Sequence, residues 1–324
     1  FPTMPIIEQI LVAGGAGFVG QNLVRELLRR YPNTQITVID NGNHTTANLL
    51  PVEANRCVWY RRDIRRRKDI EGLFEATSFD IVINLAAHSG VVDSINDPNA
   101  NFEVNVVGNF NLLDLARTNN VQRYLFSSTG GAIIGDGKPP LTEDMEANPL
   151  SPYGVSKLVG ELYASIFDRC YDMNTCCLRF SNVYGEYSAH KQNLIPMFIK
   201  SALEGTQANL FGNGAQERDF IYVGDLVEGI CRVLECESDG VLQLATGRHT
   251  SVNNLVTILG DLLPEEYILN WEHQPARLGE VYQTWCDNTK SVSLLGNYVS
   301  TSLVEGLRQT IDWYIQHHCP EEAD

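Results

Sequence analysis

Two side chains that could together move a proton lie four residues apart, at Tyr153 and Lys157. Ser151 and Pro152 just before them are typical of a helix start, and the predicted helix runs to about Tyr171. Residues four apart share one helix face, so the Lys157 ammonium is expected to lower the pKa of the Tyr153 phenol. A phenolate could then take a proton from an alcohol while a cofactor takes the hydride. Taken alone, Tyr-x-x-x-Lys is more typical of a structural pair, so its meaning depends on its surroundings.

A predicted buried strand, Val121 to Phe126, ends in hydroxyl side chains before this helix, at Ser127, Ser128 and Thr129. A hydroxyl at the end of a strand can hold a substrate oxygen on which charge develops. The sequence therefore supplies a candidate hydrogen-bond donor as well as a candidate acid–base pair.

A glycine-rich turn follows the first predicted strand, Ile6 to Ala13, and leads into a helix-like pattern, Phe18 to Arg30. Its glycines stand at positions 14, 17 and 20. Such a turn lets a pyrophosphate approach the first amides of the helix, where the helix dipole favours anions. The same turn could also serve only to pack a strand against a helix.

A second predicted strand, Gln35 to Ile39, ends in Asp40, twenty residues after Gly20. An acid at this place accepts hydrogen bonds from the adenosine ribose hydroxyls and repels a 2′-phosphate. Together with the glycine turn, Asp40 predicts a dinucleotide site and favours NAD over NADP.

Strand-like and helix-like patterns alternate along the chain, which predicts βαβ units and a parallel sheet. The expected fold class is α/β, a Rossmann-type doubly wound parallel sheet with a smaller C-terminal α/β substrate lobe. We expect the NAD-binding domain over residues 4–180 and the nucleotide-sugar lobe over 181–324, with a segment near 219–246 returning to the sheet. Expected helices cover 67–76, 100–119, 194–203 and 303–317, and expected strands cover 174–180, 218–222 and 241–245. The stretch after Thr129 is expected to be a loop.

Composition narrows the class of protein. The chain has 324 residues and a formal net charge of −16, and its one basic block, 61–68, includes Asp63. Nucleic acid is not expected as a partner, because phosphate binding needs clustered positive charge. No apolar run reaches the ~20 residues of a membrane span and residues 1–4 do not resemble a signal peptide, so a cytoplasmic protein is expected. The eight cysteines form no C-x-x-C pair and are expected to be buried free thiols; no metal site is expected.

Taken together, these features resemble an extended short-chain dehydrogenase/reductase of the NAD-dependent sugar-nucleotide epimerase/dehydratase family. The segments that carry the resemblance are GGAGFVG (14–20), ID (39–40), DI (63–64), NLAA (84–87), NVVGNFNLLDLAR (105–117), SSTGGAIIG (127–135), SPYGVSK (151–157), LRFSNVYG (178–185), ERDFIYVGDL (217–226) and PARLGEV (275–281). They cover nearly the whole chain in the family's order, and they are more specific for the family than for its substrate.

The resemblance implies NAD as the cofactor and assigns parts of it to matched positions. The three glycines would hold the pyrophosphate, Asp40 the adenosine ribose, Asp63 the adenine amine, and Lys157 the nicotinamide ribose. The full set of implied cofactor contacts is Gly14, Gly17, Phe18, Val19, Gly20, Asp40, Asn41, Asp63, Ile64, Leu85, Ala86, Ala87, Asn105, Ser127, Tyr153 and Lys157.

The resemblance also implies a nucleotide-diphosphate sugar as the substrate. Tyr153 would be the base, and Thr129 the hydroxyl partner, because the SSTGGAIIG loop is one residue longer than the family's common form; Ser128 is the rival. Arg218 and Arg277 would grip the diphosphate by forked hydrogen bonds, although each alone is also typical of a surface ion pair. The implied substrate contacts are Ser128, Thr129, Asn182, Asn193, Leu194, Arg218, Arg277 and Thr284.

The loop after Thr129 bears on the reaction. Dehydratases of the family carry an Asp-Glu pair there and decarboxylases keep a Glu, whereas this chain has Gly130 and Gly131. The resemblance therefore implies hydride removal and return at C4, an NAD-dependent 4-epimerisation of UDP-glucose and UDP-galactose through a transient 4-keto sugar. Thr284 stands where a large Tyr excludes N-acetyl groups in some hexose 4-epimerases, so UDP-GlcNAc and UDP-GalNAc are expected substrates too.

Two alternatives stay open. One is another enzyme of the family, a C2 epimerase or a 4-keto reductase acting on a CDP- or dTDP-sugar. The other is a non-catalytic NAD-binding scaffold, which the presence of Thr129, Tyr153 and Lys157 disfavours. The resemblance further implies a homodimer through a four-helix bundle formed by helices 100–119 and 153–171 of each copy. His88, His190 and Lys191 are left without a role.

Overall fold

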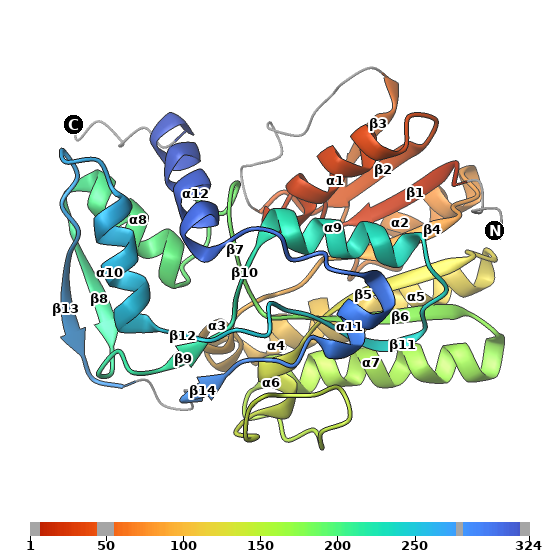
Figure 1. Cartoon of the computed structure of the whole chain (residues 1–324). Coiled ribbons are helices and arrows are strands. Elements are labelled where there is room, and N and C mark those ends of the chain that lie inside the picture. The colour runs from red at the N-terminus through yellow and green to blue at the C-terminus, as the bar shows by residue number, and fades with distance from the viewer. Residues whose placement is uncertain (1–6, 44–54, 277–280, 318–324) are drawn as a thin grey trace.

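The computed structural model describes residues 7–43, 55–276 and 281–317, and a seven-stranded sheet forms its centre (Figure 1). In pairing order the strands are β11 (Gly240–Leu244), β6 (Asn174–Phe180), β5 (Arg123–Thr129), β4 (Ile81–Asn84), β1 (Gln9–Ala13), β2 (Gln35–Asp40) and β3 (Cys57–Arg61). Every pair is parallel. The predicted Rossmann-type sheet is therefore confirmed. The order of the strands reverses at β1: β2 and β3 follow it on one side, and β4, β5 and β6 lie on the other. A ligand site is expected at the carboxyl ends of β1 and β4, where the order reverses.

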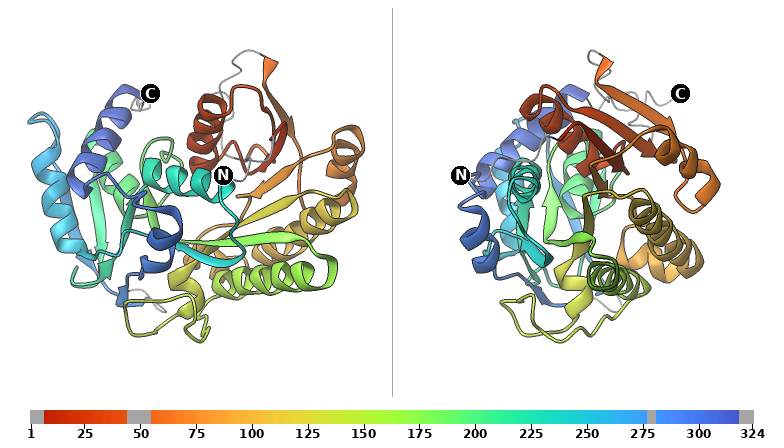
Figure 2. Two further views of the ribbon diagram at one scale, coloured as in Figure 1. Left: turned by 45° about the vertical axis from the view of Figure 1, so that its right-hand side comes forward. Right: turned by 90° about the vertical axis from the view of Figure 1, so that its right-hand side faces the viewer.

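Helices cover both faces of this sheet (Figure 2). On one face, α1 (Phe18–Arg30), α9 (Val223–Leu234) and α11 (Thr289–Leu295) share a core with alternate residues of the strands. On the other face, α2 (Arg67–Ala76), α5 (Asn109–Thr118) and α7 (Pro152–Tyr171) close the second core. The central strands are continuous apolar runs because both of their faces are buried.

Two local features differ from the sequence-based expectation. The predicted helix 100–119 is observed as α4 (Pro98–Phe102), a π-helical segment η3 (Glu103–Gly108) and α5, preceded by the short α3 (Val91–Asn96). The stretch after Thr129, expected to be a loop, forms the short helix α6 (Gly130–Ile134). Side-chain periodicity does not distinguish a π turn from an α turn, and two glycines at a helix start do not predict a helix.

A smaller lobe lies beside the sheet (Figures 1 and 2). Its core is formed by α8 (Leu194–Glu204), α10 (Val252–Leu262), α12 (Leu303–His317) and β8 (Gln207–Phe211), and the exposed strand β13 (Asn270–Gln274) pairs in parallel with β8. Two small sheets join it to the larger domain: β7 (Asn182–Tyr184) with β10 (Phe220–Tyr222), and β12 (Thr250–Ser251) with β9 (Glu217–Arg218) and β14 (Gln283–Thr284).

The strand expected over 218–222 is interrupted at Asp219, so that its two halves, β9 and β10, join different sheets. The Asp219 carboxylate is buried and accepts hydrogen bonds from the Ser181 hydroxyl at 3.1 Å and from the amides of Thr246 and Gly247 at 3.1 and 3.0 Å. An inward carboxylate held in this way ends one strand and redirects the chain into the next.

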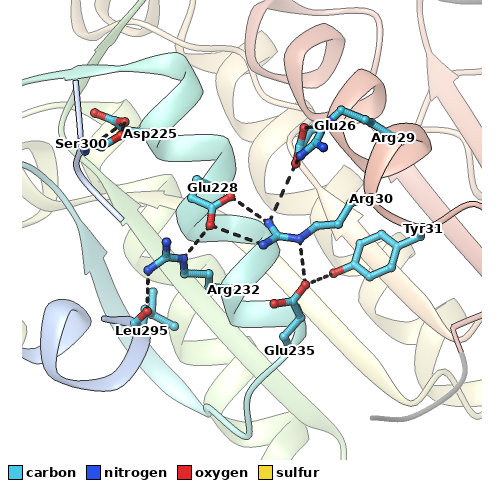
Figure 3. A network of polar contacts seen from close by, with 10 residues as sticks. All are labelled: Glu26, Arg29, Arg30, Tyr31, Asp225, Glu228, Arg232, Glu235, Leu295 and Ser300. Carbon is cyan, nitrogen blue, oxygen red and sulfur yellow. Dashed lines mark hydrogen bonds and ion pairs between the residues drawn. The ribbon is translucent and has the colours of Figure 1, made fainter. Parts of the chain in front are cut away.

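Helix α9 follows β10 in the chain and packs on α1, with polar contacts at the C-terminal end of α1 (Figure 3). Arg30 of α1 forms ion pairs of 2.9 Å with both Glu228 and Glu235. The Tyr31 hydroxyl donates to Glu235 at 3.0 Å, and Arg232 pairs with Glu228 at 2.6 Å. The larger domain is therefore completed by a segment that comes after the first elements of the smaller lobe.

In the part of the chain that the structure describes, no helix has the length and hydropathy needed to cross a bilayer.

Candidate active site

The glycine turn brings the ends of β1 and β4 into close contact. Gly14 has a positive φ of 75°, and its amide donates to the Ile39 carbonyl at 2.8 Å. A Cβ at Gly14 would lie 2.6 Å from the Ala86 amide nitrogen, so no side chain fits there. The turn after β1 and the turn after β4, which carries Ala86, are thus held against each other by a residue that must be glycine.

The start of α1 is built to receive an anion. Gly17 is the N-cap residue and offers no side-chain cap, and the first turn holds no acidic residue. A Cβ at Gly20 would lie 2.3 Å from the Gly14 carbonyl oxygen, so only glycine lets the helix approach the turn this closely. The first-turn amides of Phe18 and Val19 therefore start a helix whose N-terminus can hold a pyrophosphate.

Asp40 lies beside this turn. Its carboxylate accepts a hydrogen bond from the Ala16 amide at 3.2 Å and another from the Gly42 amide at 2.9 Å. These bonds fix the side chain at the carboxyl end of β2, next to α1, where a ribose attached to the pyrophosphate would lie. Asn41 follows directly, and its carbonyl accepts from the Arg61 side chain at 3.0 Å.

The expected adenine contacts are only partly available. Asp63 forms a 2.6 Å ion pair with Arg65, whose hydrogen bonds lower the pKa of that carboxyl. The side chain of Ile64 is buried and occupies the space that a Cβ on Gly108 would need. In this structure the Asp63 carboxylate is engaged by Arg65, a partner that the sequence analysis did not consider, so its contact with adenine stays a prediction.

The turn after β4, Leu85 to Ala87, is positioned by a buried amide. The Asn105 side chain, from η3, accepts from the His88 amide at 2.8 Å and donates to the His88 carbonyl at 3.1 Å. It also donates to the Ser156 hydroxyl of α7 at 2.9 Å. Asn105 thus fixes the turn after β4 relative to the helix that carries Tyr153. Ser156 was missed by the sequence analysis.

Lys157 is buried in the interior between α7 and the sheet. Its ammonium donates to the Ser127 carbonyl at 2.8 Å and lies 4.9 Å from the centre of the Phe126 ring and 5.9 Å from that of the Tyr153 ring. Burial lowers the pKa of Lys157 to about 7, and the charge of Glu161 opposes this in part.

The expected effect of Lys157 on the pKa of Tyr153 is not found. Burial raises the pKa of the Tyr153 phenol to about 12. The prediction of a lowered pKa is therefore wrong, because the Lys157 ammonium donates to the Ser127 carbonyl and desolvation of the phenolate dominates.

The two candidate hydroxyls have different surroundings. The Ser128 hydroxyl is buried and donates to Glu161 at 2.5 Å, and Glu161 forms a buried 2.8 Å ion pair with Arg179. Thr129 is the last residue of β5 and the N-cap of α6, is partly exposed, and makes no side-chain cap hydrogen bond. Since successive residues of a strand face opposite sides, Ser128 points to α7, and this favours Thr129 as the hydroxyl open to a substrate.

The two glycines after Thr129 lie against residues from the end of the chain. A Cβ at Gly130 would be 2.6 Å from the Gln243 side-chain oxygen, and a Cβ at Gly131 would be 3.3 Å from the Thr284 side chain. Thr284 also pairs with Arg218 across β14 and β9. An acidic side chain at the start of α6 would therefore have to displace the Gln243 or Thr284 side chain, and Thr284 lies next to the helix that follows β5.

A cleft in the smaller lobe collects four of the eight predicted substrate contacts. Its cavity volume is about 180 Å³, smaller than that of most small-molecule sites. Asn182, Asn193, Leu194 and Arg218 line it together with apolar side chains such as Phe211. Arg277 lies outside the described residues. In the part of the chain that the structure covers, no three His, Cys, Asp or Glu side chains gather as a metal site.

Comparison with known proteins agrees with this site. The model of the NAD dependent epimerase/dehydratase family matches residues 10–245. This chain belongs to the NAD-dependent epimerase/dehydratase family. The predicted resemblance is therefore confirmed, and NAD is the cofactor of the family. The glycine turn, the uncapped start of α1 and the Asp40 carboxylate fit that dinucleotide.

Similar proteins from this epimerase/dehydratase family span nearly the whole chain. A putative UDP-glucose 4-epimerase of Methanocaldococcus jannaschii is 34% identical over 94% of this chain and 97% of its own length. UDP-glucose 4-epimerase of Thermotoga maritima, solved with UDP-glucose, has a TM-score of 0.89 at 31% identity, covering 95% of this chain and 99% of that one. The Thermus thermophilus enzyme, solved with NAD, has a TM-score of 0.89 at 28% identity, with the same coverage.

Other similar family members carry different names. A UDP-N-acetylglucosamine 4-epimerase of Methanobrevibacter ruminantium has a TM-score of 0.84 at 27% identity over 96% of this chain. A UDP-glucuronic acid 4-epimerase of Bacillus cereus has a TM-score of 0.87 at 27% identity over 95% of it. A dTDP-glucose 4,6-dehydratase of Mycobacterium tuberculosis is 31% identical over 94%. Similarity thus fixes the family and leaves the sugar and the reaction to the residues of the site.

Proposed function

We propose that this protein is a nucleotide-sugar 4-epimerase that interconverts UDP-glucose and UDP-galactose through a transient 4-keto sugar. One observation carries the proposal. Lys157, one turn after Tyr153 on α7, reaches the Ser127 carbonyl of β5, the strand that ends in Thr129, whereas Gly130 and Gly131, packed on Gln243 and Thr284, stand where a dehydratase carries its acids. The site can therefore move a proton and position an alcohol, and it lacks the groups that would expel water.

In the proposed reaction, the residues of the chain act on the sugar hydroxyl at C4. Thr129 holds the oxygen and Tyr153 removes its proton, so that the C4–O bond becomes a carbonyl as the hydride leaves C4. Bound NAD supplies the acceptor and later the donor of that hydride. After the keto sugar turns about its diphosphate, the opposite face of C4 receives the hydride and Tyr153 returns the proton to the oxygen.

The nucleotide end and the sugar end of the substrate would be held by different lobes. Arg218 and the amides of Asn182 and Asn193 line the cleft in which the nucleotide would lie, and Thr129 and Tyr153 lie on the larger domain. Binding on the smaller lobe leaves the hexose free to turn, which is what presentation of both faces of C4 requires.

A direct experiment tests the proposal. The purified protein is denatured and the released NAD is assayed; separately, intact protein is offered UDP-glucose or UDP-galactose and the epimers are separated. We expect bound NAD and conversion in both directions. A 4-keto-6-deoxy product, or stoichiometric loss of nicotinamide absorbance, would contradict the proposal in favour of a dehydratase or a reductase.

We also propose that UDP-GlcNAc is a substrate, because Thr284 is small where it faces Gly131. Changing Thr284→Tyr is expected to lower kcat/KM for UDP-GlcNAc by at least about tenfold, by filling the space of the N-acetyl group, with a smaller effect on UDP-glucose. The matched control is Gln283→Tyr, the exposed neighbour on β14. An equal loss for both sugars would contradict the role of Thr284.

We further propose a homodimer formed by the helices on one side of the sheet. Large apolar side chains of this surface are exposed: Phe102 by 54%, Leu162 by 59% and Ile166 by 49%. Exposed apolar residues at i and i+4 of α7 are typical of a helix that packs against another helix. Two copies related by a two-fold axis would cover this surface in a four-helix bundle.

The dimer proposal predicts a change of mass. Leu162→Asp combined with Ile166→Asp is expected to convert the dimer to monomer in light scattering, because two charges at the centre of an apolar interface are desolvated without partners. Ile268→Asp, at a site that is 67% exposed in the smaller lobe, is the control and should leave the mass unchanged. A monomeric unchanged protein would refute the proposal.

We infer a cytoplasmic location from the thiols. The cysteines within the described residues are all free, and burial raises the pKa of Cys176, Cys177, Cys231 and Cys286. The expectation of buried thiols is wrong for Cys170, which is exposed at the end of α7, and for Cys57 and Cys236, which are only partly buried. Free thiols on a chain of this size are typical of a reducing compartment.

A further inference from the structure

Lys191 joins the two lobes at the edge of the candidate site. It lies in the loop before α8, and its ammonium donates a hydrogen bond of 3.1 Å to the hydroxyl of Ser89. Ser89 lies two residues after Ala87, on the turn that follows β4. A residue of the substrate lobe thus reaches the nicotinamide side of the larger domain, across 102 positions of sequence.

The charge of Lys191 has no counter-charge in contact with it. Within the described ranges, no carboxylate lies within ion-pair distance of this ammonium, whose hydrogen-bond partner is a neutral hydroxyl. Desolvation lowers the pKa of Lys191, and Asp93 opposes this only from a distance. A partly buried ammonium in these surroundings is destabilising for the free protein, and an anion that binds beside it would remove that penalty.

The loop that carries Lys191 is held in place. The Lys191 amide donates to the Ser188 carbonyl at 2.8 Å. The Ser188 hydroxyl is buried, donating to the Gly185 carbonyl at 2.6 Å. Lys200 of α8 donates to the carbonyls of Ala189 at 3.1 Å and Lys191 at 3.3 Å. A side chain on a loop fixed by four hydrogen bonds is preorganised, so little ordering is needed when a ligand binds.

The neighbours of Lys191 show what could lie beside it. Gln192, the next residue, lines the cleft that also contains Asn182 and Arg218. Ser89, the partner across the lobes, adjoins the turn that would face the nicotinamide. The ammonium therefore lies between the cleft and the cofactor side, where the sugar end of a nucleotide sugar would pass.

We propose that Lys191 is a substrate-binding residue that exchanges its hydrogen bond with Ser89 for one with an anionic oxygen of the bound nucleotide sugar. This inference rests on the proposed function. Two parts of such substrates could supply the oxygen: the sugar-linked phosphate, present in every nucleotide-diphosphate sugar, and the C6 carboxylate of a uronate. Either oxygen would replace the Ser89 hydroxyl as the hydrogen-bond partner of the same ammonium.

The test measures binding by titration calorimetry on the protein with its retained NAD. UDP, UDP-glucose and UDP-glucuronate are titrated into the unchanged protein and into Lys191→Met. We expect Lys191→Met to bind UDP-glucuronate, or all three ligands, about 10- to 100-fold more weakly. This is the effect of losing a charge-assisted hydrogen bond. Lys191→Arg should restore most of the affinity because it keeps the charge.

The three ligands distinguish a phosphate oxygen from a carboxylate oxygen as the partner of Lys191. A similar loss for all three ligands assigns Lys191 to the phosphate; a loss confined to UDP-glucuronate assigns it to the carboxylate. Lys68→Met, on exposed α2, removes the same charge away from the site and should leave all three affinities unchanged. Equal NAD content and melting temperature in every variant show that the fold is intact.

Two results would overturn the inference and are distinguishable. If Lys191→Met binds all three ligands as the unchanged protein does, Lys191 has no role in binding, while the proposed function stands. If the unchanged protein itself retains NAD but binds no uridine nucleotide, the proposed function fails first and the role of Lys191 fails with it.

Discussion

Changing Tyr153→Phe is expected to lower kcat for epimerisation by about 10²- to 10⁴-fold, the contribution of a positioned acid–base group. The ring would keep its place at the start of α7, since Ser151 caps this helix by accepting from the Gly154 amide at 3.2 Å. The content of bound NAD should be unchanged, because the glycine turn and Asp40 are untouched. Turnover with UDP-galactose and the NAD released on denaturation are the two measurements.

The matched control is Tyr171→Phe, which removes a hydroxyl from the exposed end of the same helix and should keep full activity. If Tyr153→Phe kept more than a tenth of the activity, another group would be the base. If it lost both activity and NAD, Tyr153 would be needed for cofactor binding, and its role in proton transfer would need a separate test.

Changing Gly20→Ala is expected to remove bound NAD and to lower the free energy of unfolding by more than about 2 kcal/mol, the range of severe steric changes. The added Cβ would lie 2.3 Å from the Gly14 carbonyl oxygen and 2.5 Å from the Gly15 Cα, and both are backbone atoms that cannot rotate away. The helix start must therefore move from the turn that would hold the pyrophosphate. Urea denaturation and NAD content measure the two effects.

Gly260→Ala is the control for a glycine within a helix. A Cβ at Gly260 of α10 meets nothing within 4 Å, so the change should stabilise the protein by about 0.5–1 kcal/mol through helix propensity. NAD content should stay the same. A Gly20→Ala protein that retained its NAD would show that the pyrophosphate site does not depend on the contact between α1 and the turn.

Elements with strong local signals could be predicted from the sequence with their bounds. Helices α2 and α12 and strand β6 lie where they were expected, because each combines a clear apolar period with a defined end. The helix start at Ser151–Pro152 was likewise predicted, and the structure shows the capping hydrogen bond. The glycine turn and Asp40 adjoin each other because both follow neighbouring parallel strands, which is a property of the fold class.

What the sequence could not supply depends on contacts between distant segments. Whether Ser128 or Thr129 is open to a substrate is decided by Glu161, 33 residues away. The pKa of Tyr153 depends on where the Lys157 ammonium points, and a spacing of four residues does not fix that direction. The contact of Lys191 with Ser89 joins two loops, whose sequences carry no period from which a pairing could be read.

The order of the elements along the chain also limits how hybrid proteins could be made from two relatives. Helix α9 and strand β11 complete the domain built on the seven-stranded sheet, although they come after the first elements of the smaller lobe. In a hybrid chain joined near residue 180, the residues that pair with Arg30 and the strand that pairs with β6 would therefore come from the other relative. Sugar preference in such a family is more easily altered by point changes around the cleft than by grafting a whole C-terminal block.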